Sequence, residues 1–170
     1  MFGLAQKSIM IDKDLLRKTV DEAIAGTDLF IVEIDVNPGN EIVVELDSAT
    51  GIDIDMCATV TRKIEAVFDR DVEDYQLEVG SSGITSDFKV RAQYDKNLGN
   101  DVEVLTRDGR KLYGVLTEVA EGDAADRDVD FTVEVPVKVK EPGAKRPVAR
   151  QEPVKLNSKD CKYVRYDLKF

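Results

Sequence analysis

The sequence contains no histidine, and only two of its 170 residues are cysteines. Without histidine there is no imidazole for acid-base catalysis, for a Ser-His-Asp or Cys-His nucleophile, or for the usual transition-metal sites. Cys57 and Cys161 lie far apart and neither has a C-x-x-C partner, so we interpret both as small buried apolar residues. The sequence therefore predicts no catalytic residue, no cofactor and no metal site.

Long apolar runs are also lacking. No segment approaches the ~20 apolar residues needed to cross a bilayer, and the first ten residues lack the basic and apolar regions of a signal peptide. We therefore expect a cytoplasmic protein without membrane contact. Its composition, 42% apolar and 34% charged, is ordinary for a soluble globular chain, and its length allows one medium domain or two small ones.

Charge is distributed unevenly along the chain. Residues 1–137 carry 14 Lys and Arg against 30 Asp and Glu, whereas residues 138–170 carry 10 against 4, so the two parts have net charges of −16 and +6. An acidic body with a basic C-terminal part can present different faces to RNA and to a basic protein. This polarity is the first indication of function.

The N-terminal half alternates helical and strand-like patterns. The predicted order is helix, strand, strand, helix, strand, at residues 11–26, 29–36, 41–48, 53–71 and 75–79. Asp12 is a plausible N-cap of the first helix and Gly26 its stop, while Asp53 or Asp55 caps the second. A turn over residues 37–40 joins the first two strands as a hairpin. This order predicts a two-layer α+β domain.

One face of the predicted hairpin is strongly acidic, because its outward positions are Glu33, Asp35, Glu41 and Glu45. Such a face is commonly only solvated, but it could also bind a basic partner.

The pattern changes after Asp87. Residues 88–100 predict a short helical turn, and the remainder contains short alternating strands joined by Gly, Asp and Pro turns, at residues 101–106, 111–119, 129–139 and 161–170. This pattern favours a small β-barrel. We place the domain boundary between residues 86 and 92, which gives domains 1–87 and 88–170 with a linker around 84–92.

Two basic segments are candidate partner contacts. The sequence Asp108-Gly109 predicts a type I′ turn whose tip carries Arg107, Arg110 and Lys111, which could meet phosphates or simply be solvated. The segment 138–155 contains Lys145, Arg146 and Arg150 together with prolines and a glycine. These should keep it out of regular structure and leave its cations exposed. If the segment binds RNA, the affinity should be salt-sensitive.

Two other motifs have weaker functional interpretations. Asp126, Asp128 and Asp130 are spaced like calcium ligands, but the glycine and glutamate of that loop are missing at Phe131 and Val137. The segment "GSSGITSDF" at residues 80–88 contains a G-x-x-G but follows a strand and lacks internal cations, so a nucleotide-binding loop is disfavoured.

Three segments in this order, "GIDIDMCATVTRKIEAVFD", "YQLEVGSSGITSDF" and "LGNDVEVLTRDGRKLYGVLTEV", resemble the RimP family of ribosome maturation factors. The resemblance extends from about Met10 to Phe170. Its most specific part is D-x-C at 55–57 followed by Y-x-L-E-V-x-S-x-G at 75–83. The sequence departs from the family at residues 84–87, where an Asp-Arg-Pro segment is typical. Lys89 and Arg91 are the nearest cations that could replace that arginine.

The resemblance implies a KH-like N-terminal domain, an Sm-like or SH3-like C-terminal barrel, and an interdomain joint at Gly80, Ser82 and Gly83. It also implies a non-catalytic monomer that binds the immature small (30S) ribosomal subunit and promotes its maturation. The expected partners are the basic ribosomal protein near the decoding centre and rRNA. The alternative is an Sm-like RNA-binding protein that acts without the ribosome. An enzyme is disfavoured because no nucleophile, base and oxyanion donor can be assembled.

Overall fold

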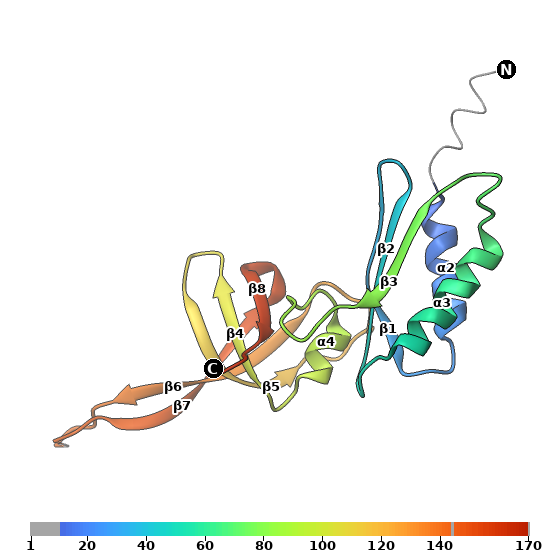
Figure 1. Ribbon diagram of the computed structural model, residues 1–170. Coiled ribbons are helices and arrows are strands. Elements are labelled where there is room, and N and C mark those ends of the chain that lie inside the picture. Colours follow the sequence, from blue (N-terminus) through green and yellow to red (C-terminus); the bar gives the residue numbers. More distant parts are fainter. Residues whose placement is uncertain (1–10, 144, 170) are drawn as a thin grey trace. The chain divides into compact units, whose positions relative to one another are not determined.

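The computed structural model describes residues 11–143 and 145–169, and the chain divides after Ser82 into two compact units (Figure 1). Unit 1 spans residues up to 82 and unit 2 starts at Gly83, a few residues before the domain boundary expected from the sequence. Each unit has its own apolar core. The α+β class expected from the sequence is confirmed.

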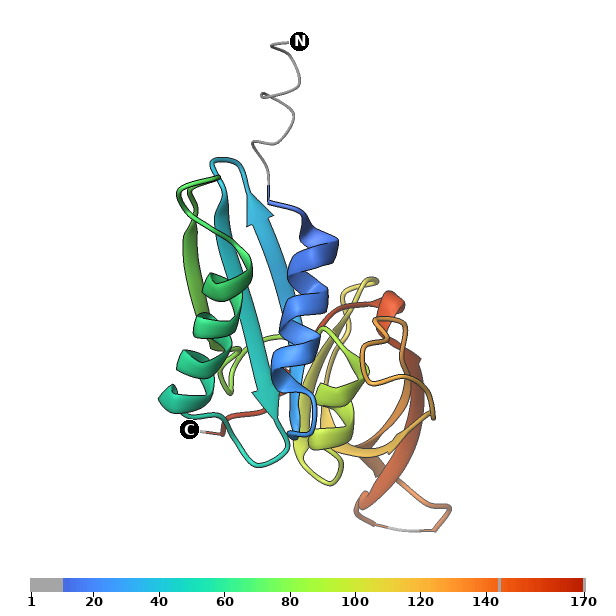
Figure 2. The same ribbon diagram turned by 90° about the vertical axis from the view of Figure 1, so that its right-hand side faces the viewer.

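Unit 1 has the predicted order of helices and strands. Its elements are α2 (Lys13–Ile24), β1 (Leu29–Asn37), β2 (Glu41–Ser48), α3 (Ile54–Val67) and β3 (Gln76–Ser81). The sheet order is β1-β2-β3, in which β1 and β2 are antiparallel and β2 and β3 are parallel. Both helices cover the same face of this sheet, which leaves the other face uncovered by elements of unit 1 (Figure 2).

The capping residues explain where the two helices begin. The Asp12 side chain accepts hydrogen bonds from the amides of residues 14 and 15, and Asp53, rather than Asp55, accepts one from the Met56 amide. These bonds satisfy amides that a helix start leaves without intrahelical partners. Gly26 follows α2 with a φ of +80°, a conformation that favours glycine. The core between helices and sheet includes Leu16, Val20, Val44, Leu46, Val60 and Ile64.

Unit 2 is an antiparallel sheet with a short helix, α4 (Arg91–Lys96). Its strands are β4 (Asp101–Thr106), β5 (Lys111–Val119), β6 (Asp130–Val139), β7 (Val148–Asn157) and β8 (Cys161–Tyr166), with a 3-10 turn, η1 (Ser158–Asp160), before β8. The strand order is β7-β6-β5-β4-β8. The predicted small barrel is therefore found only in part, because no ladder joins β7 to β8 among the described residues. The two strands are separated by η1, and β7 continues along β6 instead.

The prediction that segment 138–155 is irregular is confirmed for residues 140–143 and 145–147 and is wrong for residues 148–155, which belong to β7. Arg150 lies on β7 opposite Val137 of β6, and Pro136 and Pro153 are both accommodated within strands. Proline lacks a backbone donor, so it is tolerated where one side of a strand is unpaired. β7 is an edge strand, and β5 pairs with β6 only over residues 131–134. Neither proline therefore interrupts a ladder.

The two cysteines differ in burial. Cys161 is buried in the core of unit 2 as predicted, whereas Cys57 on α3 is only half-buried, and both are free thiols. The prediction that both would be buried is therefore wrong for Cys57, because the buried residues of α3 are Val60 and Ile64.

Asn40 is a buried polar residue at the β1-β2 turn. Its Oδ1 accepts from the Ile11 amide at 3.0 Å, its Nδ2 donates to the Asp74 carbonyl at 3.1 Å, and its φ is 56°. Its own carbonyl accepts from the Gln76 amide. This one residue thus joins the start of α2 and the start of β3 to the hairpin.

We expect Asn40→Ala to lower the free energy of unfolding by about 3 kcal/mol, because two buried hydrogen bonds are lost and alanine is strained at positive φ. Asn40→Gly should cost about 1 kcal/mol less, since glycine removes the strain but not the lost bonds. Urea unfolding of the three proteins measures this. Equal destabilisation by the two substitutions would show that backbone strain contributes nothing.

Candidate binding surfaces

The four acidic residues predicted for unit 1 lie together on the face of the sheet opposite the helices. Glu33 of β1 is in register with Glu45 of β2, and Asp35 and Glu41 continue the same face toward the hairpin turn. Two carboxylates directly opposite each other repel, so this arrangement costs stability unless cations lie nearby. The sheet thus concentrates negative charge at one surface, which we call the acidic face.

The acidic face extends onto β3, which the sequence analysis did not include. Glu78 is exposed and pairs in register with Val43, which itself faces Asp35. The missing information was the parallel pairing of β3 with β2. The sequence "YQLEV" predicts a strand at residues 75–79 but does not specify which strand it pairs with.

The three cations at the predicted hairpin tip lie around residues 107–110, which connect β4 to β5. The Arg107 amide donates to the Asp160 carbonyl at 2.9 Å, and its Nε donates to the Lys159 carbonyl at 2.6 Å. Lys111 Nζ lies 4.0 Å from a carboxylate oxygen of Glu103. Arg107 is therefore held by backbone carbonyls, which leaves its charge without a neutralising carboxylate in these contacts.

The type I′ turn predicted at Asp108-Gly109 is wrong. Only Gly109 has a positive φ, +92°, whereas type I′ requires two such residues. The Thr106 hydroxyl donates to the Asp108 carboxylate and accepts from the Arg110 amide, which stabilises a longer four-residue loop. The hydrogen bond from Thr106 and the nearby Arg110, 3.3 Å away, lower the pKa of Asp108 below its ordinary value.

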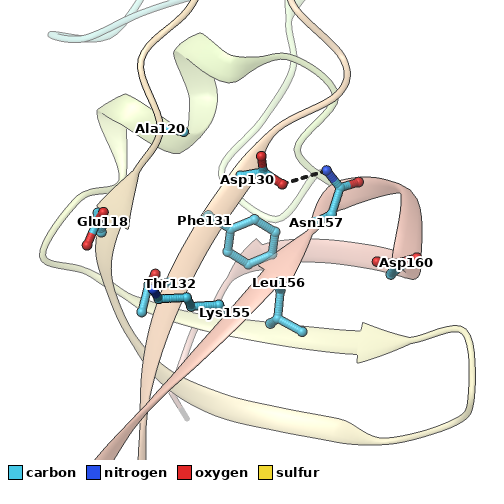
Figure 3. A pocket seen from close by; sticks show the side chains of 9 residues that line it. All are labelled: Glu118, Ala120, Asp130, Phe131, Thr132, Lys155, Leu156, Asn157 and Asp160. Carbon is cyan, nitrogen blue, oxygen red and sulfur yellow. Dashed lines mark hydrogen bonds between the residues drawn. The ribbon is translucent and has the colours of Figure 1, made fainter.

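Unit 2 has two adjacent depressions, the smaller of which borders this loop. The larger, about 450 Å³, lies between β5, β6 and β7 and contains the hydrogen bond from Asn157 to Asp130 (Figure 3). The second, about 410 Å³, is lined by Arg107 and Arg110 and shares Lys155 with the first. Each depression also has carboxylates in its lining. The mixture of charges suits polar contacts and offers no assembled nucleophile and base.

The other predicted cations occupy the far end of the β6-β7 ribbon, whose distal part extends beyond the other strands of unit 2 (Figure 1). Lys145 and Arg146 are exposed in the connection between the two strands, and Arg150 on β7 forms an ion pair with Glu141. The structure does not bring these cations to the β4-β5 loop. These three cations therefore form a surface separate from the loop, whereas Lys155, at the end of the same segment, lines the depression beside Arg107 and Arg110.

A charged cluster on β4 and β8 was not predicted. Glu103, with 15% of its side chain exposed, accepts hydrogen bonds from the Tyr163 hydroxyl and from Arg165 Nη2 at 2.9 Å. The Arg165 guanidinium lies 4.0 Å from the centre of the Tyr163 ring. The hydrogen bonds from Tyr163 and Arg165 lower the pKa of Glu103, and the bond to Glu103 raises the pKa of Tyr163.

Because the pKa of Glu103 is lowered on folding, its charge stabilises the folded state above the unfolded pKa of about 4.3. That contribution should be lost as pH falls through the folded pKa. We expect wild type to be more stable than Glu103→Gln near neutral pH, with the difference shrinking below about pH 4.3. Urea unfolding between pH 7 and 3 measures this. A constant difference would contradict the assignment.

The three residues predicted to form an interdomain joint differ in conformation. Gly83 has a φ of +80°, whereas Gly80 lies within β3 in register with Glu45 and has no positive φ. The buried Ser82 donates its amide to the Leu46 carbonyl at 3.2 Å. Only Gly83 therefore requires the left-handed conformation, and it comes directly after the end of unit 1.

The aspartates with calcium-like spacing bind protein groups instead. Asp126 pairs with Arg91, and Asp128 accepts from Asn157 at 2.7 Å and lies 3.2 Å from Lys159. The side chain of Arg91 is 7% exposed and binds the loop after β5. Arg91 thus has a structural role in unit 2. No group of three or more potential metal ligands occurs in the described part of the chain.

Comparison with known proteins identifies the family. The model of the RimP N-terminal domain matches residues 15–85. Proteins named ribosome maturation factor RimP in two strains of Porphyromonas gingivalis are 42% identical over 137 residues, which is 81% of this chain and 86% of theirs. This chain belongs to the RimP family. A RimP from Flavobacterium psychrophilum is 29% identical over 126 residues, or 74% of this chain and 77% of its own length.

The RimP N-terminal match begins in α2 and ends at residue 85, so it covers nearly all described elements of unit 1 and the joint residues. The family resemblance noted in the sequence is thereby confirmed. None of the helices in the described residues has the length and apolar character needed to cross a membrane.

Proposed function

We propose that this RimP-family chain is a non-catalytic assembly factor that binds the immature small ribosomal subunit in the cytoplasm and promotes its maturation. The observation that carries the proposal is the 42% identity, over most of both chains, to proteins named ribosome maturation factor RimP. Charge supports it independently, because unit 1 carries an acidic face and unit 2 carries two exposed basic surfaces.

The acidic face is assigned to the basic ribosomal protein near the decoding centre. Asp35 and Glu41 lie on this face and Glu78 continues it, so a cationic extension would meet several carboxylates at once. Complementary charge raises the association rate and fixes orientation more than it adds affinity. The contact would thus orient the factor on the subunit.

The basic surfaces of unit 2 are assigned to rRNA. Arg107 and Arg110 border a depression beside the β4-β5 loop, and Lys145 and Arg146 occupy the end of the β6-β7 ribbon. Each phosphate that these cations neutralise makes binding more sensitive to salt. The factor would favour one conformation of the maturing subunit by the difference between its affinities for the two conformations.

The finer architecture belongs to the same proposal. Unit 1 would be a KH-like domain, and unit 2 an Sm-like or SH3-like barrel left open between β7 and β8. We assign residues 1–87 and 88–170 to independently folding domains joined at Gly80, Ser82 and Gly83. Because β7 and β8 are the end strands of this sheet, an Sm-like oligomer that binds RNA without the ribosome is the alternative.

Co-sedimentation with small subunits, large subunits and whole ribosomes at two salt concentrations tests the proposal. We expect salt-sensitive binding to free small subunits alone, weakened by reversing Arg107, Arg110 and Lys111 to Glu. The matched control reverses three exposed cations of α2, namely Lys13, Arg17 and Lys18. No enrichment on small subunits at low salt would overturn the proposal, and an oligomer in light scattering would favour the Sm-like alternative.

A further inference from the structure

A groove lies between the start of α3 and the end of β3 in unit 1. It has a volume of about 600 Å³, and we call it the β3 groove. It is lined by the start of α3 with the residues before it, and by the end of β3, namely Ile52, Asp53, Ile54, Asp55, Cys57, Val79, Gly80 and Ser81. Of these lining residues, only Gly80 belongs to a surface discussed above, as one of the proposed joint residues.

One apolar side chain of the β3 groove is unusually exposed to solvent. Ile54, the first residue of α3, is 85% exposed, the highest value among the large apolar residues that the structure describes. Ile52 and Val79, which also line the groove, pack against the core of unit 1. Burying one such side chain on binding is worth about 1.5–3 kcal/mol of transfer free energy, so this exposure is unfavourable unless a partner covers it.

The strand beside the groove has an open edge. In unit 1, β3 pairs with β2 alone, and the amides of Gln76 and Ser82 donate toward β2 and its turn. Backbone groups alternate in direction along a strand. The amide and carbonyl groups of Leu77, Val79 and Ser81 therefore point to the outer edge of β3. Such a row of groups is a template for adding a further strand.

The two sides of that open edge differ in chemistry. On the helix side lies the apolar groove, whose rim carries Asp53 and Asp55 and whose lining contains no Lys or Arg. On the other side lies the acidic face, with the exposed Glu78. Burial and the Asp53 charge raise the pKa of the Cys57 thiol, in keeping with a negative potential here.

We propose that an extended basic peptide binds the β3 groove as an added strand, with apolar side chains against Ile54 and cations beside Glu78. An extended segment points successive side chains to opposite faces, so a peptide of alternating apolar and basic residues meets both surfaces at once. The inference rests on the proposed function only for the source of the peptide, which would be a basic ribosomal protein. The groove itself is tested without ribosomes.

The probe is an acetylated eight-residue peptide of alternating Val and Lys, titrated into the full chain and followed by fluorescence anisotropy and amide NMR. We expect saturable binding with shifts of the Leu77, Val79 and Ser81 amides. Ile54→Ser should weaken binding about tenfold, the loss expected from one buried aliphatic side chain. A peptide methylated at alternate backbone nitrogens should bind at least tenfold more weakly, because it cannot pair with the strand.

Matched controls separate the groove from general effects. Val72→Ser removes a side chain that is 83% exposed outside the groove and should leave affinity unchanged. Asp55→Asn should weaken binding two- to threefold at low salt, whereas Asp14→Asn, at the same position of α2, should not.

Several results would overturn the inference. These are equal affinity for Ile54→Ser, equal affinity for the methylated peptide, absence of saturable binding, or shifts confined to the acidic face. Co-sedimentation of the Ile54→Ser variant with small subunits tests the proposed function separately from the peptide titration. If the peptide does not bind but the wild-type protein still binds small subunits, the assignment of the β3 groove is wrong and the proposed function is unaffected.

Discussion

Gly114→Ala is expected to destabilise unit 2 by more than about 3 kcal/mol and to prevent its folding in the extreme case. Gly114 lies on β5, in register with Val102 of β4. A Cβ atom there would lie 2.1 Å from the Glu134 carbonyl oxygen and 2.8 Å from its carbon, both backbone atoms of β6. Neither contact can be relieved by rotating a side chain, so the central strands would have to separate.

Gly80→Ala is the matched control, because Gly80 is also a strand glycine without positive φ. Its Cβ would meet nothing within 4 Å, so the substitution should be neutral or raise stability by up to about 1 kcal/mol. Urea unfolding and amide NMR of both variants measure the contrast. A Gly114→Ala protein as stable as wild type would show that β5 and β6 can move apart at little cost.

The elements of unit 1 were predictable because their signals are local. Helical spacing of Leu16 and Val20 and the alternation along β1 and β2 each depend on residues close in sequence. The same alternation placed Glu33 and Glu45 on one face. Pairing between distant strands could not be predicted in this way, since nothing within "YQLEV" specifies that Glu78 joins the acidic face beside Val43.

Features of unit 2 that depend on distant contacts could not be predicted. Proline and glycine in segment 138–155 indicated a loop, which is found between β6 and β7. From residue 148 onward, pairing with β6 overrides the local preference along an edge strand, where Pro153 is tolerated. The Asp108-Gly109 pair indicated a two-residue turn, but the Thr106 hydroxyl stabilises a longer loop. The close approach of β6 to Gly114 likewise could not be predicted from the sequence.

Arg91 illustrates how a cation can be misread without its surroundings. The sequence suggested Arg91 as a substitute for a family arginine at the linker, but its side chain points into unit 2. Its Nη1 donates to the Asp123 carbonyl at 3.0 Å and pairs with Asp126, and its Nη2 donates to the Asp128 carbonyl at 3.3 Å. The amides of Arg91 and Ala92 also bind this loop.

Arg91→Ala should therefore lower the free energy of unfolding by about 2–4 kcal/mol, because a buried guanidinium and its bonds to the loop are lost together. Urea unfolding measures the loss. Hydrogen exchange should also accelerate at the Ala92 amide, which donates to the Ala124 carbonyl at 3.0 Å. Arg91→Lys should retain part of the stability, since a single ammonium cannot reach all three acceptors.

Gly122 provides an independent test of this contact. A Cβ at Gly122 would lie 2.0 Å from Arg91 Nη1, so Gly122→Ala should displace the guanidinium and weaken its bonds to the loop, at a smaller cost than Arg91→Ala. In the double variant the guanidinium is absent, so the alanine at residue 122 has nothing to clash with. The double variant should therefore lose about 1–3 kcal/mol less unfolding free energy than the sum of the two single losses. Additive losses would mean that Gly122 acts through the backbone alone. Non-additive losses would instead show that residue 122 must lack a side chain to leave room for the Arg91 guanidinium.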